Sequence, residues 1–140
     1  MATILVVDDK YEIRSLLKQV LTLHNHVVLE AADGMEALDA VHPDTLPDVI
    51  FMDHQMPRLS GIDCARGLRT LFPSLKIILM SSSFGIDDDG YLAASKHLFT
   101  DILPKPFRIK DVVSTLAYAL GDETREKTIF SEVTEKTQPR

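Results

Sequence analysis

The sequence predicts an α/β protein in which a mostly parallel β-sheet lies between layers of helices. Short apolar runs rich in β-branched residues alternate five times with longer segments whose apolar residues recur at helical spacing. Most of these runs are continuous instead of alternating with polar residues, which is typical of strands buried on both faces. Repeated strand–helix units of this kind favour a doubly wound, five-stranded parallel sheet with helices on both faces.

The first half of the chain supplies three predicted strands separated by two predicted helices. Thr3–Val7 is short, apolar and β-branched, and the apolar residues of the following segment, Tyr11–Leu23, have helical spacing. Val27–Leu29 indicates the second strand. Gly34–Val41 is a short helix that begins at an Asp-Gly turn signal, and Val49–Met52 is the third strand.

The second half continues the alternation. Cys64–Phe72 predicts a helix that stops before a proline, and Ile77–Met80 predicts the fourth strand. Tyr91–Leu98 gathers its apolar and small residues on one face, which favours a helix, and Phe99–Leu103 is a weaker fifth strand. Ile109–Leu120 is the last predicted helix, and the glycine after it is a helix-stop signal.

The composition argues against several classes of function. The chain has 140 residues with 15 Lys and Arg against 21 Asp and Glu, a formal net charge of −6, and one cysteine. The single Cys64 excludes an internal disulfide and a zinc site with several cysteines. The acidic balance argues against direct nucleic-acid binding, which needs a basic face. No segment resembles a targeting signal or approaches the roughly 18 apolar residues of a membrane span, so we expect a cytoplasmic protein without membrane insertion.

The composition changes after Gly121. Residues 122–140 are mostly charged or polar, and only Ile129, Phe130 and Val133 are apolar. We therefore predict one domain over residues 1–121, followed over 122–140 by a polar C-terminal tail or a short extra helix. Because no DNA-binding helix pair or catalytic domain is recognisable after Gly121, we expect the output to be contact with another protein.

Polar side chains follow the predicted strands at their carboxyl ends. Asp8 and Asp9 follow the first strand, Asp53 the third, Ser81 the fourth and Lys105 the fifth. Right-handed crossovers bring these ends to one edge of a parallel sheet, so we expect the groups to converge there. Two carboxylates about 4 Å apart repel by about 1 to 4 kcal/mol, so either one is protonated or a cation is bound. Oxygen ligands favour Mg²⁺, and a purely structural Asp–Lys network is the other interpretation.

These residues resemble a known family, the receiver domain of two-component response regulators, and in particular its stand-alone chemotaxis-type members. The residues that carry the resemblance are Asp8-Asp9, the stretch DHQMPRLSG from Asp53 to Gly61, Ser81, and Lys105-Pro106-Phe107. The resemblance covers about residues 3–120. It implies the flavodoxin-like strand order 2-1-3-4-5 and a cis peptide bond between Lys105 and Pro106.

The resemblance also implies the chemistry of the site. Asp53 would be the phosphoacceptor, taking a phosphoryl group from the phosphohistidine of a sensor histidine kinase or a histidine phosphotransfer protein. Asp9, Asp53 and the backbone carbonyl of Gln55 would ligate Mg²⁺, and Asp8 would act mainly through a metal-bound water. Lys105 would hold one phosphoryl oxygen as a point charge.

Ser81 would donate its hydroxyl to another phosphoryl oxygen, and its movement would shift the packing of the fourth helix, fifth strand and fifth helix. A downstream protein would read that face, or the phosphoryl group would pass onward in a phosphorelay. The resemblance thus implies a switch instead of a turnover enzyme, and a monomer or a phosphorylation-dependent dimer. Ile102 stands where the family usually has a switch aromatic residue, so the output face is expected to be unusual.

Two other functions stay open at this point. A receiver fold that no longer takes phosphate would be a phosphorylation-independent interaction module, although the complete set of site residues argues against it. A Mg²⁺-dependent phosphatase with an aspartate nucleophile needs D-x-D after the first strand, and Lys10 replaces the second Asp of that motif. Gln55 and Ser83 are candidates for control of hydrolysis, whereas strand alternation points His54 away from the site.

Overall fold

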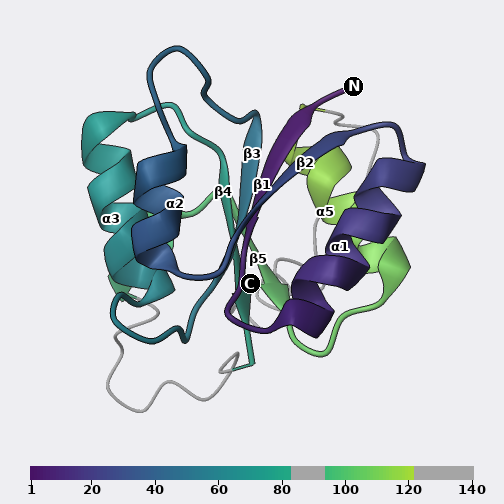
Figure 1. Ribbon diagram of the computed structural model, residues 1–140. Helices are drawn as coiled ribbons and strands as arrows, with labels where there is room; N and C mark the ends of the chain where they lie inside the picture. The colour runs from purple at the N-terminus through teal and green to yellow at the C-terminus, as the bar shows by residue number, and fades with distance from the viewer. Residues whose placement is uncertain (83–93, 122–140) are drawn as a thin grey trace, which may run out of the picture.

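The computed structural model describes residues 1–82 and 94–121 (Figure 1). Within them, five parallel strands form one sheet in the order β2-β1-β3-β4-β5, which confirms the fold class and the order that the resemblance implies. The strands are β1 (Thr3–Val7), β2 (Val27–Ala31), β3 (Val49–Asp53), β4 (Ile77–Ser81) and β5 (Asp101–Pro104). The helices are α1 (Tyr11–Leu23), α2 (Gly34–Ala40), α3 (Gly61–Leu71), α5 (Ile109–Ala119) and the short 3-10 helix η1 (Lys96–Leu98).

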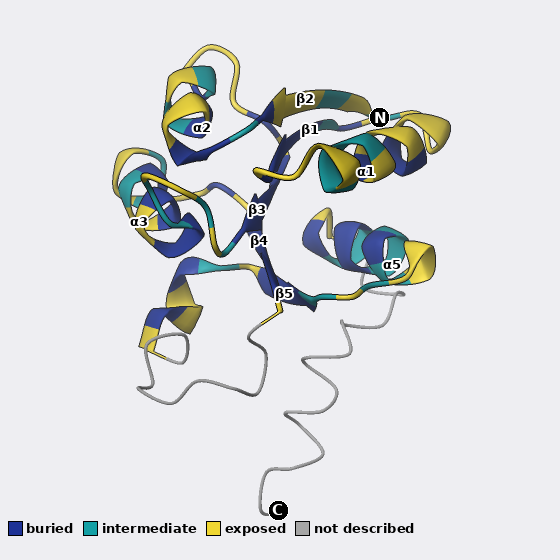
Figure 2. Ribbon diagram, turned by 60° about the horizontal axis from the view of Figure 1, so that its bottom comes forward, coloured by how far each residue is buried: buried dark blue, intermediate teal, exposed yellow. Residues whose placement is uncertain are grey.

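The sheet lies between two helical layers, with α1 and α5 on one face and α2 and α3 on the other (Figure 2). Successive residues of a strand point to opposite faces of the sheet, so each central strand contributes side chains to two hydrophobic clusters. Ile4 of β1 packs in the cluster that contains Leu17 of α1 and Leu116 of α5. Its neighbour Leu5 packs in the cluster that contains Leu68 of α3. Every residue of β3 and β4 is buried, as the continuous apolar runs predict.

The edge strand β2 departs from the double-sided burial expected of the strands. Among the described strands it pairs with β1 alone, and Val27 and Leu29 keep 44% and 43% of their surface exposed. The hydrophobic pattern therefore identifies β2 as a strand but does not reveal that it lies at an edge.

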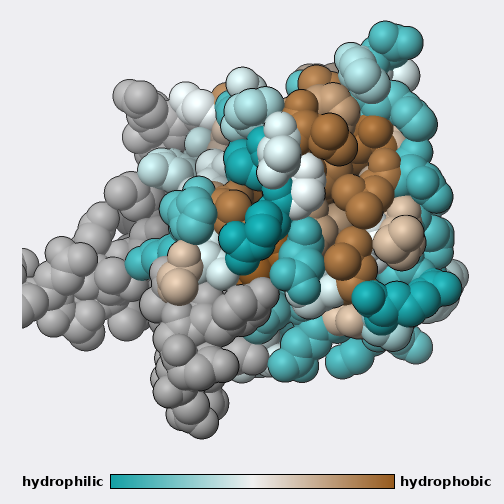
Figure 3. Space-filling view, turned by 90° about the vertical axis from the view of Figure 1, so that its left-hand side faces the viewer, coloured by the Kyte–Doolittle hydropathy of each residue, from teal (hydrophilic) through white to brown (hydrophobic). Residues whose placement is uncertain are grey.

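Figure 3 shows another partly apolar surface, on the side formed by α2 and α3. Exposed apolar residues of these two helices are Met35 and Leu71.

Two predicted elements begin at the wrong residue, and each error has a local cause, whereas several predicted ends differ from the observed ones by one or two residues. Helix α3 begins at Gly61 instead of Cys64, because the Ser60 hydroxyl accepts a hydrogen bond from the Asp63 amide at 3.1 Å and caps the helix. Strand β5 begins at Asp101 instead of Phe99, since the Phe99 amide donates to the Lys96 carbonyl and closes the preceding 3-10 turn. Apolar periodicity carries no information on either contact.

Several predictions concern parts of the chain outside the described residues. The helix expected over 91–98 lies partly outside the described residues, and the described part ends in η1. Ser83 and the tail or extra helix expected over 122–140 lie outside them altogether. Among the helices of residues 1–82 and 94–121, none has the length and hydrophobicity to cross a membrane.

Candidate functional site

The strands bring the predicted site residues to the carboxyl edge of the sheet. Asp8 and Asp9 directly follow β1, Asp53 and Ser81 are the last residues of β3 and β4, and Lys105 directly follows β5. The register pairs the end of β1 with β3, the end of β3 with β4 and the end of β4 with β5, so these positions lie along one edge of the sheet. The convergence predicted from strand positions is therefore observed for the backbone of all five residues.

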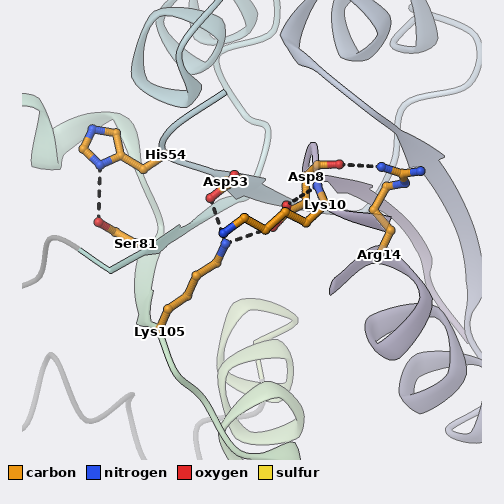
Figure 4. A network of polar contacts seen from close by, with 7 residues as sticks. All are labelled: Asp8, Lys10, Arg14, Asp53, His54, Ser81 and Lys105. Atoms are coloured by element: carbon orange, nitrogen blue, oxygen red, sulfur yellow. Dashed lines mark hydrogen bonds and ion pairs between the residues drawn. The ribbon is translucent and has the colours of Figure 1, made fainter. Parts of the chain in front are cut away.

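Lys105 bridges two of the carboxylates (Figure 4). Its Nζ donates to Asp53 Oδ1 at 2.9 Å and to Asp8 Oδ2 at 3.0 Å. The Asp8 side chain is fully buried and the Asp53 side chain is 7% exposed, so water screens these ion pairs weakly. The other Asp8 oxygen accepts from the Lys10 amide at 2.9 Å, which fixes the orientation of this carboxylate.

Three carboxylates gather at the same point. Asp8, Asp9 and Asp53 each offer an oxygen atom, and these oxygens all lie within 4.8 Å of one another. Asp9 is exposed and forms part of a cavity that is also lined by Gln55 and Lys105. A set of oxygen donors with an open side suits a hard divalent cation that retains some of its water ligands, such as Mg²⁺.

The electrostatics of the group point the same way. Burial raises the pKa of the Asp53 carboxyl from 3.8 to about 6; the hydrogen bond from Lys105 opposes this rise and the charge of Asp8 adds to it. Burial acts to lower the pKa of Lys105, but its contacts with Asp53 and Asp8 outweigh that effect and raise it. One lysine thus faces more negative charge than it balances, and a bound cation would relieve the excess.

The loop after β3 is shaped to close over Asp53. The Gly61 amide donates to the His54 carbonyl at 2.9 Å, and a side chain at Gly61 would collide with the backbone carbonyl of Asp53. The close approach of the two backbones therefore requires the glycine of the DHQMPRLSG stretch. In the same loop Arg58, with a φ of 69°, forms an ion pair with Asp33, the residue that caps α2.

The peptide bond between Lys105 and Pro106 is cis, as the resemblance implies. Pro106 and Phe107 line the same cavity as Lys105. The segment after β5 thus forms one wall of the acidic site.

Ser81 is the exception among the predicted site residues. Its hydroxyl is turned away from Asp53 and Lys105 and lies 3.3 Å from Nδ1 of His54 (Figure 4). His54 is indeed off the acidic face, as strand alternation predicts, but sequence reasoning missed its contact with Ser81. Parallel register places His54 beside Ser81, because the His54 amide bonds to the carbonyl of Met80 at 3.0 Å. No sequence pattern fixes that register.

Together, the fold and the site define a doubly wound α/β protein with an acidic, lysine-bridged pocket at the carboxyl edge of its sheet. The family model described as "Response regulator receiver domain" matches residues 4–117, so the chain belongs to this family of two-component signalling switches.

The similar proteins agree with this assignment. The chain is 34% identical over 121 residues to "Response regulator MprA" of Mycolicibacterium vanbaalenii, covering 86% of the chain and 51% of that relative. It is 34% identical over 113 residues to the protein of the same name from Mycobacterium avium, covering 81% of the chain and 48% of the relative. The chain thus spans about half the length of these curated relatives.

Solved structures with the same fold match the chain over nearly their whole length. The Vibrio cholerae chemotaxis protein CheY4 has a TM-score of 0.76 and 28% identity, with 86% of this chain and 99% of that one covered. The response regulator TrrA from Thermotoga maritima, in complex with Mg(2+)-BeF, has a TM-score of 0.74 and 28% identity, with 86% and 100% covered.

Proposed function

We propose that this chain is a phosphoacceptor switch in which the Asp53 carboxylate takes a phosphoryl group with the help of Mg²⁺. The observation that carries the proposal is the position of Asp53 at the carboxyl edge, held by Lys105 beside Asp8 and Asp9. A carboxylate so placed is a nucleophile with a cation and a metal-binding group around it. We propose Ser81 as the hydroxyl that joins this group once phosphate is present.

The chemistry needs one bond to form and one to break. An Asp53 oxygen attacks phosphorus, the bond from phosphorus to the donor nitrogen breaks, and the electron pair stays on the departing imidazole. The product is an aspartyl phosphate. The transfer spreads negative charge over the phosphoryl oxygens, so the positive and hydrogen-bonding groups that stabilise these oxygens in the transition state set the rate.

The donor set fits Mg²⁺. Asp9, Asp53 and the Gln55 carbonyl would hold the ion, and Asp8 would act mainly through one of its water ligands. When bound, the ion offsets negative charge on the phosphoryl oxygens. The similarity to the structure titled as a complex of TrrA with Mg(2+)-BeF supports this proposal.

The hydrogen bonds of Lys105 would change when Asp53 is phosphorylated. In the structure it divides its hydrogen bonds between Asp53 and Asp8. A phosphoryl group brings a charge of about −1.5 to −2 and three acceptor oxygens. We propose that Lys105 keeps Asp8 and exchanges the Asp53 oxygen for a phosphoryl oxygen.

We propose that the chain acts in the cytoplasm and that its donor is a sensor histidine kinase or a histidine phosphotransfer protein. The proposed output is a protein contact or an onward phosphorelay. The described part of the proposed output face is β5 and α5. Ile102 of β5 is 2% exposed and packs with Leu79 and Leu98. Because Ile102 is an aliphatic side chain packed in the core, we propose that the output depends on other residues of the face.

The test is phosphorylation by acetyl phosphate, followed by intact mass measurement. We expect a gain of one phosphoryl group that needs Mg²⁺, is prevented by EDTA, and is absent from Asp53→Asn. Labelling of Asp53→Asn would contradict the assignment of the acceptor. If the wild-type chain gains nothing from acetyl phosphate and does not respond to beryllofluoride with Mg²⁺, the phosphorylation-independent interaction module is the correct function.

A further inference from the structure

We infer that His54 is a positioning residue that holds the Ser81 hydroxyl away from the acceptor carboxylate in the resting state. The inference rests on the proposed function and deepens it. It assigns to His54, which lies next to Asp53 in the chain but off the acidic face, control over how readily the phosphorylated state forms.

The backbones of both residues are fixed by the sheet. The His54 amide donates to the Met80 carbonyl at 3.0 Å, and the His54 carbonyl accepts from Gly61 at 2.9 Å. The Ser81 carbonyl accepts from the Lys105 amide at 2.9 Å. With both main chains held, rotation of the Ser81 side chain is the simplest motion that brings its hydroxyl to the acidic side.

The observed Ser81 orientation has a specific polar contact. Ser81 is 1% exposed, and a buried hydroxyl is costly to leave without a hydrogen-bond partner. His54 Nδ1 lies 3.3 Å from its oxygen, on the side opposite Asp53 and Lys105 (Figure 4). A hydroxyl that turns to a phosphoryl oxygen has to leave this nitrogen, so the His54 contact and the phosphoryl contact compete for Ser81.

This competition sets an equilibrium. A contact made only in the resting state lowers the population of the state that captures phosphate, and its removal raises the apparent affinity for a phosphoryl mimic. One net hydrogen bond corresponds to a factor of about two to ten in such an equilibrium. In this proposal His54 acts on the acceptor through Ser81.

Two variants of similar shape separate this role from packing. His54→Leu removes the polar atom, whereas His54→Asn keeps a polar atom two bonds from Cβ, where Nδ1 stands. We expect His54→Leu to bind beryllofluoride with Mg²⁺ about two to ten times more tightly than wild type, measured by amide chemical shifts at fixed pH. His54→Asn should stay near wild type.

Ser81→Ala supplies the decisive background. Without the hydroxyl, His54→Leu should leave beryllofluoride affinity unchanged, because the residue it acts through is gone. An equal gain in both backgrounds would show that His54 acts by packing and would overturn the inference. So would a His54→Leu variant that binds no more tightly than wild type.

The contact is also measurable without any phosphate mimic. In the metal-free protein, the ¹⁵N shift of His54 Nδ1 should change on Ser81→Ala, and an unchanged shift would contradict the inference. If wild type fails to respond to both beryllofluoride and acetyl phosphate, the proposed function fails and this inference fails with it. If wild type responds and His54→Leu binds as wild type does, only the role of His54 is refuted.

Discussion

Replacing Asp53 with Asn should make the metal-free protein more stable at neutral pH, although it removes one partner of Lys105. Burial raises the pKa of the Asp53 carboxyl from 3.8 to about 6, in spite of the hydrogen bond from Lys105. The folded state therefore binds the proton more tightly than the unfolded chain does. Ionising Asp53 costs the folded protein free energy, and asparagine does not ionise.

The magnitude follows from the same values. A tenfold change in proton affinity is worth about 1.4 kcal/mol, so a pKa moved from 3.8 to about 6 costs about 3 kcal/mol above pH 6. Relaxation around the charged group reduces this figure, and we expect Asp53→Asn to gain about 1–3 kcal/mol at pH 7.5.

The pH dependence of the stability difference between wild type and Asp53→Asn tests the direction of the effect independently. Well below pH 3.8, Asp53 is protonated in both states and the two proteins should be equally stable. Between about pH 4 and pH 6 the folded wild type binds more protons than the unfolded chain, so its stability falls relative to Asp53→Asn as the pH rises. Above about pH 6 the difference should be constant.

Urea unfolding in EDTA, at intervals from pH 4 to pH 8, measures both quantities. The difference between the two proteins isolates Asp53 from the other carboxyl groups. Equal stability at pH 7.5, or a difference that grows in the opposite direction as the pH rises, would refute the account of Asp53 as a buried, destabilising charge.

Two further predictions concern neighbouring parts of the site. Gly61→Ala should lower the free energy of unfolding in urea by about 2–4 kcal/mol, because the added Cβ would collide with the Asp53 carbonyl. The control Gly67→Ala should be neutral or should raise it by up to about 1 kcal/mol, since the atom nearest to a Cβ added there is 3.9 Å away. Equal effects of the two substitutions would argue against close approach of the loop. Lys105→Ala should still bind Mg²⁺ but should not transmit phosphorylation to β5 and α5, and phosphorylation-induced amide shifts in α5 that match those of wild type would contradict this role.

Much of the architecture follows from local sequence. Apolar runs and helical spacing locate all five strands, and the residues after them identify the acidic site, because a parallel sheet carries every strand end to one edge. The exposure of Val27 and Leu29 in β2 was not predictable in this way, since it depends on which strand lies at the sheet edge. Strand order came from the resemblance to receiver domains, not from periodicity.

Side-chain partners were harder to predict. The pairing of Lys105 with both Asp8 and Asp53 depends on distances across the sheet from β5 to β1, which sequence separation does not contain. The contact of His54 with Ser81 depends on the register between β3 and β4 and on a side-chain rotamer. Residue type identifies groups able to react or bind, whereas geometry decides which of them meet.

The central claim is that Asp53 carries the phosphoryl group, and locating that group on the chain tests it most directly. After treatment with acetyl phosphate and Mg²⁺, borohydride converts an aspartyl phosphate to homoserine, which peptide mass spectrometry assigns to a position. We predict homoserine at position 53 alone. Homoserine at Asp8, Asp9 or any other acidic residue, with position 53 unmodified, would contradict the account.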